Sequence, residues 1–158
     1  LQQAVSGLNF QVSGRFEWKR LDEGWLIDDS YNANPGSFRG VLQSIRFMHP
    51  KTPLIAVIGP MAELGENAEQ LHKEVGEVIY HSGCKKLLVL GGDLGESYLE
   101  GWKNAGGPKE NAKRFESLEE LQNDFQQDWD QKSIVLVKGS RSAAMERFVK
   151  AILNHESE

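Results

Sequence analysis

The sequence predicts an α/β fold, a Rossmann-like and mostly parallel sheet with helices on both faces and one antiparallel strand near the N-terminus. Short apolar runs alternate with segments whose apolar residues recur at helical spacing, which is typical of repeated strand–helix units. Residues 54–58 are apolar throughout, as expected of a strand covered on both faces. The turn signal Asp22-Glu23-Gly24 predicts a hairpin ahead of the first strand–helix unit.

The hairpin and the first helix occupy the N-terminal part of the chain. Within residues 10–20, Phe16 and Trp18 alternate as in a half-buried strand, and residues 25–29 predict its partner. A helix is then expected to begin at Pro35 and to end at His49-Pro50.

The remaining elements continue the alternation to the C-terminus. Further strands are expected at 54–58, 87–90 and 134–137, and further helices around 71–79, 94–102, 118–125 and 145–152. Ser117, with Glu120 three residues later, is a capping signal for the third of these helices. A loop containing Gly and Pro is expected at 104–111, and residues 154–158 are expected to fray.

Composition restricts the class of protein. The 158 residues fit a single domain, and the fractions of hydrophobic (39%) and charged (26%) residues are ordinary for a soluble globular protein. A net charge of −5 argues against a nucleic-acid-binding domain, which usually has a basic footprint. No apolar run approaches the length of a membrane span, and no signal peptide is visible. Cys84 is the only cysteine, which excludes an internal disulfide and fits a reducing compartment.

Polar residues crowd the end of the second expected strand. After Ile27 the chain reads Asp28, Asp29, Ser30 and then, through residues 31–34, reaches the expected helix. In open α/β sheets, ligands bind at the carboxyl ends of strands beside helix N-termini. The segment therefore fits either a ligand site or an acidic turn with an Asx-type cap.

Several familiar signatures are absent from the sequence. There is no Gly-x-x-x-x-Gly-Lys-Ser/Thr phosphate loop, no Gly-x-Gly-x-x-Gly fingerprint and no Gly-x-Ser-x-Gly elbow. The histidines, His49, His72, His81 and His155, lack metal-ligand spacing, so no metal site is expected. We expect His72 to be a capping or packing residue.

Residues 28–35, Asp-Asp-Ser-Tyr-Asn-Ala-Asn-Pro, resemble the signature of the Mur ligases of bacterial cell-wall synthesis. Three more segments fit this family in the same order: Gly14-Arg15, residues 56–65 and residues 137–141. These matches span nearly the whole chain, and they resemble only the C-terminal domain of such a ligase.

The resemblance implies roles for residues near the second strand. It implies that Asp29 accepts hydrogen bonds from the nucleotide ribose and that Arg15, near the hinge to a central domain, reaches the ATP phosphates. It also implies that Asn32 or Asn34 borders the adenine, and that Tyr31 lies at the substrate. An arginine can bind phosphate oxygens bidentately, although a solvated surface charge is the simpler alternative for Arg15.

The segment from Lys138 to Arg141 is the candidate for binding the incoming amine substrate. It lies between a buried strand and a helix expected to start near Ala143, where backbone N–H groups would favour an anion. Lys138, Ser140 and Arg141 are the expected substrate-binding residues, because the matching loop of related ligases contacts the incoming amino acid. The alternative is a strand-to-helix turn capped by the serine.

The loop at residues 59–65 departs from the family pattern, which usually reads Gly-Asp-Met where this chain has Gly59-Pro60-Met61. Any role for a carboxylate at that position is therefore in doubt. Met61 and Leu64 are expected to pack, whereas Glu63 is expected to be exposed or to line the cleft.

The resemblance also implies an activity, with partners and a location. The implied reaction is the ATP- and Mg²⁺-dependent addition of D-alanyl-D-alanine to UDP-MurNAc-tripeptide in the bacterial cytoplasm. The central domain would bind most of the ATP and Mg²⁺ and the N-terminal domain would hold the UDP end, so no catalytic residue is assigned within this chain. The start at Leu1 rather than Met fits a fragment, with residues 1–8 as a linker. The alternatives are a stand-alone nucleotide- or anion-binding module, and a diaminopimelate-adding ligase or folylpolyglutamate synthase.

Overall fold

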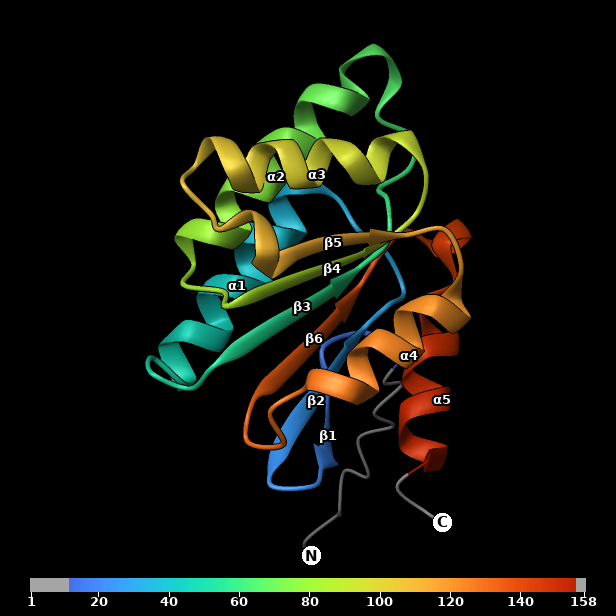
Figure 1. The fold of residues 1–158 in the computed structure, drawn as a ribbon. Coiled ribbons are helices and arrows are strands. Elements are labelled where there is room, and N and C mark those ends of the chain that lie inside the picture. Colours follow the sequence, from blue (N-terminus) through green and yellow to red (C-terminus); the bar gives the residue numbers. More distant parts are fainter. Residues whose placement is uncertain (1–11, 156–158) are drawn as a thin grey trace, which may run out of the picture.

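A six-stranded sheet organises the computed structural model, which describes residues 12–155 (Figure 1). The strand order across the sheet is β1-β2-β6-β3-β4-β5. The strands are β1 (Glu17–Leu21), β2 (Gly24–Asp29), β3 (Leu54–Ile58), β4 (Lys86–Leu90), β5 (Ala112–Phe115) and β6 (Ile134–Lys138). The helices are α1 (Pro35–Met48), α2 (Ala68–His81), α3 (Asp93–Asn104), α4 (Leu118–Asp128) and α5 (Glu146–His155).

The hairpin predicted at the N-terminus is confirmed. Strands β1 and β2 pair antiparallel around the turn at Asp22, with Trp18 opposite Ile27, whereas the other neighbouring strands pair parallel. The first strand begins only at Glu17, so residues 12–16 precede it. Phe16 has a left-handed φ of 51°, which removes it from the extended strand. Residue 10, residue 11 and the expected linker at 1–8 lie outside the described residues.

Helices cover both faces of the sheet, as predicted. Helices α1, α2 and α3 lie on one face, and α4 and α5 lie on the other (Figure 1). Each face has its own apolar cluster, because alternate side chains of a strand point to opposite faces. Residues 54–58 are all buried, which confirms a central strand covered on both sides.

The edge strand β5 is the element that the sequence pattern did not predict. It comprises Ala112, Lys113, Arg114 and Phe115, and it directly follows the loop that was expected at 104–111. As an edge strand it pairs only with β4, and its exposed Lys113 forms an ion pair with Asp124 of α4, so no continuous apolar run marks the strand.

Helices α2 and α3 approach each other closely because two glycines face the neighbouring backbone. A Cβ atom at Gly76 would lie 2.1 Å from the carbonyl oxygen of Tyr98, and one at Gly101 would lie 1.8 Å from that of Lys73. Any side chain at either position would therefore push the helices apart. Among residues 12–155, no helix combines the length and apolar character that crossing a bilayer requires.

Candidate functional site

The strand order makes the chain diverge at the carboxyl ends of β2, β6 and β3. The chain leaves β2 and β3 toward the helices on one face of the sheet, but it leaves β6 toward α5 on the other face (Figure 1). Such a divergence is where open α/β sheets bind ligands. The loops at this edge are residues 30–34, 59–64 and 139–145, which include most of the predicted site residues.

A buried ion pair joins the ends of β2 and β6. Asp29 and Lys138 are direct neighbours in the parallel register, and Lys138 Nζ lies 2.6 Å from Asp29 Oδ2. The ammonium also donates to the carbonyl of Asn32 at 3.0 Å, and the Phe16 backbone N–H donates to Asp29 Oδ1 at 3.0 Å. The side chain of Lys138 is only 2% exposed, against 16% for Asp29. Both members of this ion pair were predicted to bind ligands, but only the side chain of Asp29 reaches the surface.

The neighbouring carboxylate, Asp28, forms the Asx-type turn that was the simpler interpretation of this segment. Its Oδ1 accepts from both the backbone N–H of Ser30 at 3.2 Å and the Ser30 hydroxyl at 2.6 Å. The Tyr31 N–H donates to the carbonyl of Gly14 at 2.9 Å, which ties the segment before β1 to the end of β2. Gly14 has a φ of +79° and lies so close to Ser30 that a side chain would collide there.

Tyr31 brings together two arginines that are far apart in sequence. The guanidinium carbon of Arg15 lies 4.3 Å from the centroid of the Tyr31 ring, and that of Arg141 lies 5.2 Å from it. Both distances are typical of cation–π contacts. Both arginines are exposed, and within residues 12–155 the only ion pair of Arg141 is a long one, 3.9 Å, with Glu146. The structure therefore gathers three predicted residues into one exposed cationic cluster.

The two candidate adenine neighbours, Asn32 and Asn34, differ in their environments. Asn34 is the N-cap of α1, and its Oδ1 accepts from the backbone N–H of Ser37 at 2.8 Å. In return, the backbone N–H of Asn34 donates to the Ser37 hydroxyl at 3.0 Å. Asn32 is exposed, and within residues 12–155 its side chain makes no hydrogen bond. Only Asn32 has an amide that is wholly available to a ligand.

The segment after β6 differs from its predicted form. Helix α5 begins at Glu146 and not near Ala143, because a 3₁₀ turn over residues 141–143 ends at Ala144, whose φ of 49° is left-handed. The N-terminus of α5 thus lies beyond the predicted binding segment. Ser140 is 1% exposed, and its hydroxyl lies 3.0 Å from that of Ser142 rather than capping the turn. The buried Ser140 N–H donates to the carbonyl of Pro60 at 3.0 Å.

Two hollows flank this segment at the same edge of the sheet. The first has a volume of about 450 Å³, and its lining includes Lys19, Tyr31, Arg141, Glu146 and Lys150. The second, of about 410 Å³, is lined on the other side by residues that include Pro60, Gly91, Ser117, Ala143 and Arg147. Ligand groups could therefore approach the 139–145 segment from either side.

The loop after β3 is held by two buried side chains whose roles the sequence pattern did not reveal. His72 Nε2 accepts from the Met61 N–H at 2.9 Å, while its Nδ1 lies 2.5 Å from the carbonyl of Ala68. The Tyr98 hydroxyl donates to the carbonyl of Gly59 at 3.1 Å. The expectation that His72 packs is confirmed, but its hydrogen bond to the loop was not predicted. A lone histidine on a helix gives no sequence signal for such a bond.

Burial explains the pKa shifts of the buried groups. It lowers the pKa of His72, which favours the neutral ring that can accept from Met61, and it raises the pKa of the Tyr98 hydroxyl. Cys84 is buried, and burial raises the pKa of its thiol to about 11, which disfavours a role as a nucleophile. Met61 is buried and Glu63 is exposed. Residues 12–155 contain no cluster of three or more His, Cys, Asp or Glu suited to a metal ion.

Comparisons with known proteins agree on one family. A family model described as the Mur ligase glutamate ligase domain matches residues 14–141. The UDP-N-acetylmuramoyl-tripeptide–D-alanyl-D-alanine ligase of Escherichia coli K12 is 37% identical over 143 residues, which cover 89% of this chain and 30% of that protein. The ligase of the same name from Bacillus subtilis is 27% identical over 158 residues, which cover 96% of this chain and 34% of that protein.

Solved structures show the same relationship. A crystal structure of MurF from Acinetobacter baumannii superposes with a TM-score of 0.75 at 27% identity, covering 90% of this chain and 31% of that one. The MurF ligase from Thermotoga maritima, crystallised with ADP, gives a TM-score of 0.73 at 24% identity, covering 89% of this chain and 30% of that one. The chain spans about a third of the length of these relatives.

Proposed function

This chain belongs to the Mur ligase family, and we propose that it is the C-terminal domain of a ligase that adds D-alanyl-D-alanine to UDP-MurNAc-tripeptide. The observation that carries the proposal is the gathering of Arg15, Tyr31 and Arg141 beside the Asp29–Lys138 pair. These residues come from three segments that are far apart in sequence, and they meet at the ligand-binding edge of the fold.

The proposed reaction proceeds in two steps. The terminal phosphoryl group of ATP is transferred to the C-terminal carboxylate of the tripeptide, which releases ADP and leaves an acyl phosphate. The amine nitrogen of the dipeptide then bonds to the acyl carbon, and inorganic phosphate leaves as the amide forms. This chain has no phosphate loop, and its described residues form no metal cluster, so the central domain would hold the phosphates and the Mg²⁺.

Asp29 and Arg15 are proposed to serve the nucleotide. Each Asp29 oxygen accepts one bond within the fold, and a carboxylate oxygen has capacity for a second, which a ribose hydroxyl could donate. The Arg15 guanidinium, stacked on Tyr31, is exposed and available to phosphate oxygens. Of the two asparagines, Asn32 is the better candidate for the adenine, because Asn34 caps α1. The T. maritima relative was crystallised with ADP, which is consistent with this role.

Arg141 and Tyr31 are proposed to contact the dipeptide, whereas Ser140, which was expected to bind it, is buried and is proposed to hold the segment through its N–H bond to the Pro60 carbonyl. The free carboxylate of the dipeptide would bind the Arg141 guanidinium, whose only ion pair within residues 12–155 is the long contact with Glu146. Lys138 is proposed to act indirectly, since its buried ammonium fixes Asp29 and the carbonyl of Asn32. Domain closure would bring the edge onto the central domain when substrates bind.

Two observations disfavour the alternative functions. A stand-alone nucleotide- or anion-binding module would need no other domain, yet the relatives are about three times as long as this chain. A folylpolyglutamate synthase from T. maritima superposes less well, with a TM-score of 0.58, than the MurF structures.

The first prediction concerns this chain on its own. Purified chain with ATP, Mg²⁺, UDP-MurNAc-tripeptide and D-alanyl-D-alanine should release no phosphate above background, because half of the cleft is missing. The same chain joined to the N-terminal and central domains should release phosphate only when both substrates are present. Turnover that stays proportional to the purified chain alone would contradict the proposal.

A further inference from the structure

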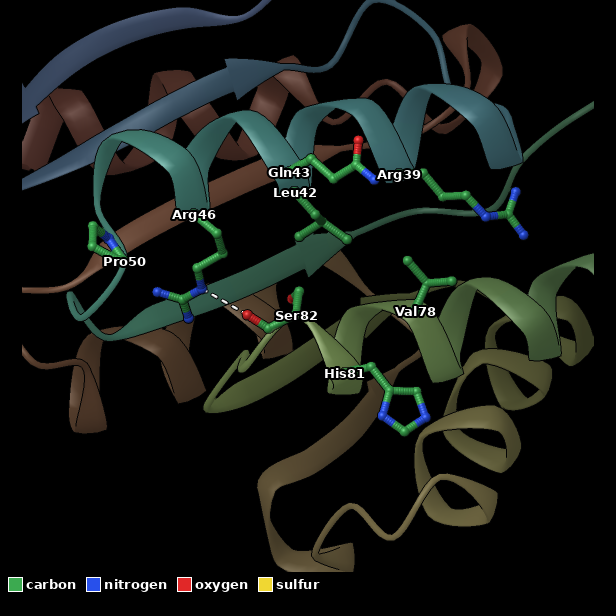
Figure 2. Close-up of a pocket in the computed structure, with 8 residues that line it drawn as sticks. All are labelled: Arg39, Leu42, Gln43, Arg46, Pro50, Val78, His81 and Ser82. Carbon is green, nitrogen blue, oxygen red and sulfur yellow. Dashed lines mark hydrogen bonds between the residues drawn. The ribbon is translucent and has the colours of Figure 1, made fainter.

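A hollow formed by described residues lies away from the ligand-binding edge, between α1 and α2. It has a volume of about 580 Å³ and is shown in Figure 2. Leu42 and Val78 face each other across its floor, and Pro50 closes the end at which α1 terminates. The hollow is large enough for several apolar side chains but is open to solvent along its length.

One wall of this groove is rigid. Arg46 donates to the carbonyls of Ser82 at 2.7 Å, Thr52 at 2.6 Å and Gly83 at 2.8 Å. These bonds clamp the C-terminal end of α1 to the end of α2, as Figure 2 shows for Ser82. The groove is therefore preformed, so a partner would not have to order it on binding.

An exposed aromatic side chain extends the groove. Phe47 lies one helical turn after Gln43, which lines the groove, and 90% of its surface is exposed. A large exposed aromatic ring beside an apolar hollow is characteristic of protein–protein contact surfaces.

The charge of the groove defines its partner. Its lining includes two cationic side chains, Arg39 and Arg46, and contains no carboxylate, although the chain as a whole has a net charge of −5. Arg39 is exposed and has no ion pair within the described part of the chain. Lys51, which directly follows Pro50, is a further exposed cation at the closed end.

We propose that the α1–α2 groove binds an acidic amphipathic helix of a partner protein, which inserts apolar side chains between Leu42 and Val78. Carboxylates on the helix would face Arg39 on the wall of the groove and Lys51 at its closed end. A second copy of this chain fits less well, because a symmetric contact would bring like charges together. The lining runs from Arg39 on α1 and Val78 on α2 past the C-terminal ends of both helices and includes none of the loop residues 30–34, 59–64 and 139–145, so its occupant leaves the ligand-binding edge free.

A pair of designed peptides tests the proposal. The probe is a helical peptide with leucines at i, i+3, i+4 and i+7 and glutamates on both flanks, and the control has lysine at every glutamate position. The ¹⁵N-labelled chain, titrated with the acidic peptide, should show amide shifts confined to α1 and α2 around Gln43 and Val78. Affinity should fall as salt increases. Equal binding of both peptides, shifts located elsewhere, or no binding would overturn the proposal.

Charge-reversal variants strengthen the test. Arg39→Glu should weaken binding of the acidic peptide by about fivefold, whereas Lys103→Glu on the exposed side of α3 should change it by less than about twofold. Equal effects of the two variants would mean that only net charge matters and would refute the groove. Analytical ultracentrifugation of the free chain tests whether a second copy of the chain occupies the groove instead. A dimer that Phe47→Ser dissociates would assign the surface to a second copy and overturn the proposal.

Discussion

At the scale of single residues, the site depends on side chains that hold others in place. Lys138 is almost fully buried and contacts Asp29, while His72 and Tyr98 hold the loop at Gly59 and Met61. None of these three side chains needs to touch a ligand to matter. Their loss would change the position of groups that line the edge of the sheet.

The Asp29–Lys138 pair makes a prediction about stability. Removing one partner should cost about 3–5 kcal/mol of unfolding free energy, because the other charge would be left buried without its counter-charge. Lys138→Met and Asp29→Asn should each destabilise the chain, and the double variant should lose less than the sum of the two. Urea denaturation of all four proteins measures this coupling. Strictly additive losses would show that the two groups do not interact.

His72 makes a prediction about pH. Burial holds its folded-state pKa below the ordinary value of about 6.5, so the unfolded chain binds the proton first as the pH falls. Stability should therefore be fully present above about pH 6.5 and should be lost as the pH falls through that value toward the folded pKa. His72→Gln keeps an acceptor but cannot titrate, so its stability should fall less between about pH 7.5 and 5.5. Thermal denaturation at both pH values tests this, and identical losses would contradict it.

At the scale of elements, helix ends fix the loops at the ligand-binding edge. Asn34 and Ser37 form a reciprocal capping box at the start of α1, and Ser117 accepts from the Glu120 N–H at the start of α4. The Ser117 cap was predicted from its sequence pattern. The Asn34 cap lies inside the segment that was assigned to the nucleotide, so one asparagine serves the fold.

The two caps allow a matched comparison. Asn34→Ala and Ser117→Ala should each lower the unfolding free energy by about 1 kcal/mol, because each leaves a first-turn N–H without its acceptor. Asn34 adjoins the proposed nucleotide residues, whereas Ser117 lies at the hollow on the other side of the 139–145 segment, so the Asn34 variant should lower ADP affinity in the complete ligase more than the Ser117 variant does. Urea denaturation and calorimetry separate the two effects. A similar loss of ADP affinity in both variants would mean that it follows from general destabilisation.

The sequence predicted those elements whose residues share one environment. Residues 54–58 are buried on both faces, so their apolar run identified the strand, and the first helix was bounded by Pro35 and Pro50. Strand β5 was missed because it lies at the edge of the sheet, where none of its residues is fully buried. Basic residues can occupy such positions, so the strand has no apolar run. The start of α5 was misplaced because Ala144, a residue with no turn preference, adopts a left-handed conformation there.

At the site, too, individual residues could be predicted from the sequence, but the contacts between them could not. The family resemblance of four segments in order identified Arg15, Asp29 and Arg141 as candidates, because each lies in a segment that matches. The Lys138–Asp29 bond spans 109 residues and the cation–π contacts of Tyr31 join separate loops, so only the folded chain could reveal them. Pairings of this kind depend on strand order, which no local pattern encodes.

At the scale of the whole molecule, the fold separates two surfaces. The carboxyl edge of the sheet carries the proposed ligand residues, and the α1–α2 groove lies toward the other end of the helices. The proposed ligase would therefore bind its nucleotide and dipeptide at one surface and a protein partner at another. The two proposals stand on different residues, so either can fail alone.

The central claim is that Asp29 serves the nucleotide and Arg141 serves the dipeptide. Steady-state kinetics of the complete ligase, with ATP and D-alanyl-D-alanine varied separately, tests it most directly. Asp29→Asn should raise the KM for ATP, and Arg141→Ala should raise the KM for the dipeptide by roughly tenfold or more, since each loses a bond to a charged group worth about 1.5–3 kcal/mol. Each variant should leave the other KM nearly unchanged. An Arg141→Ala enzyme that loses ATP affinity and keeps dipeptide affinity would contradict the assignment.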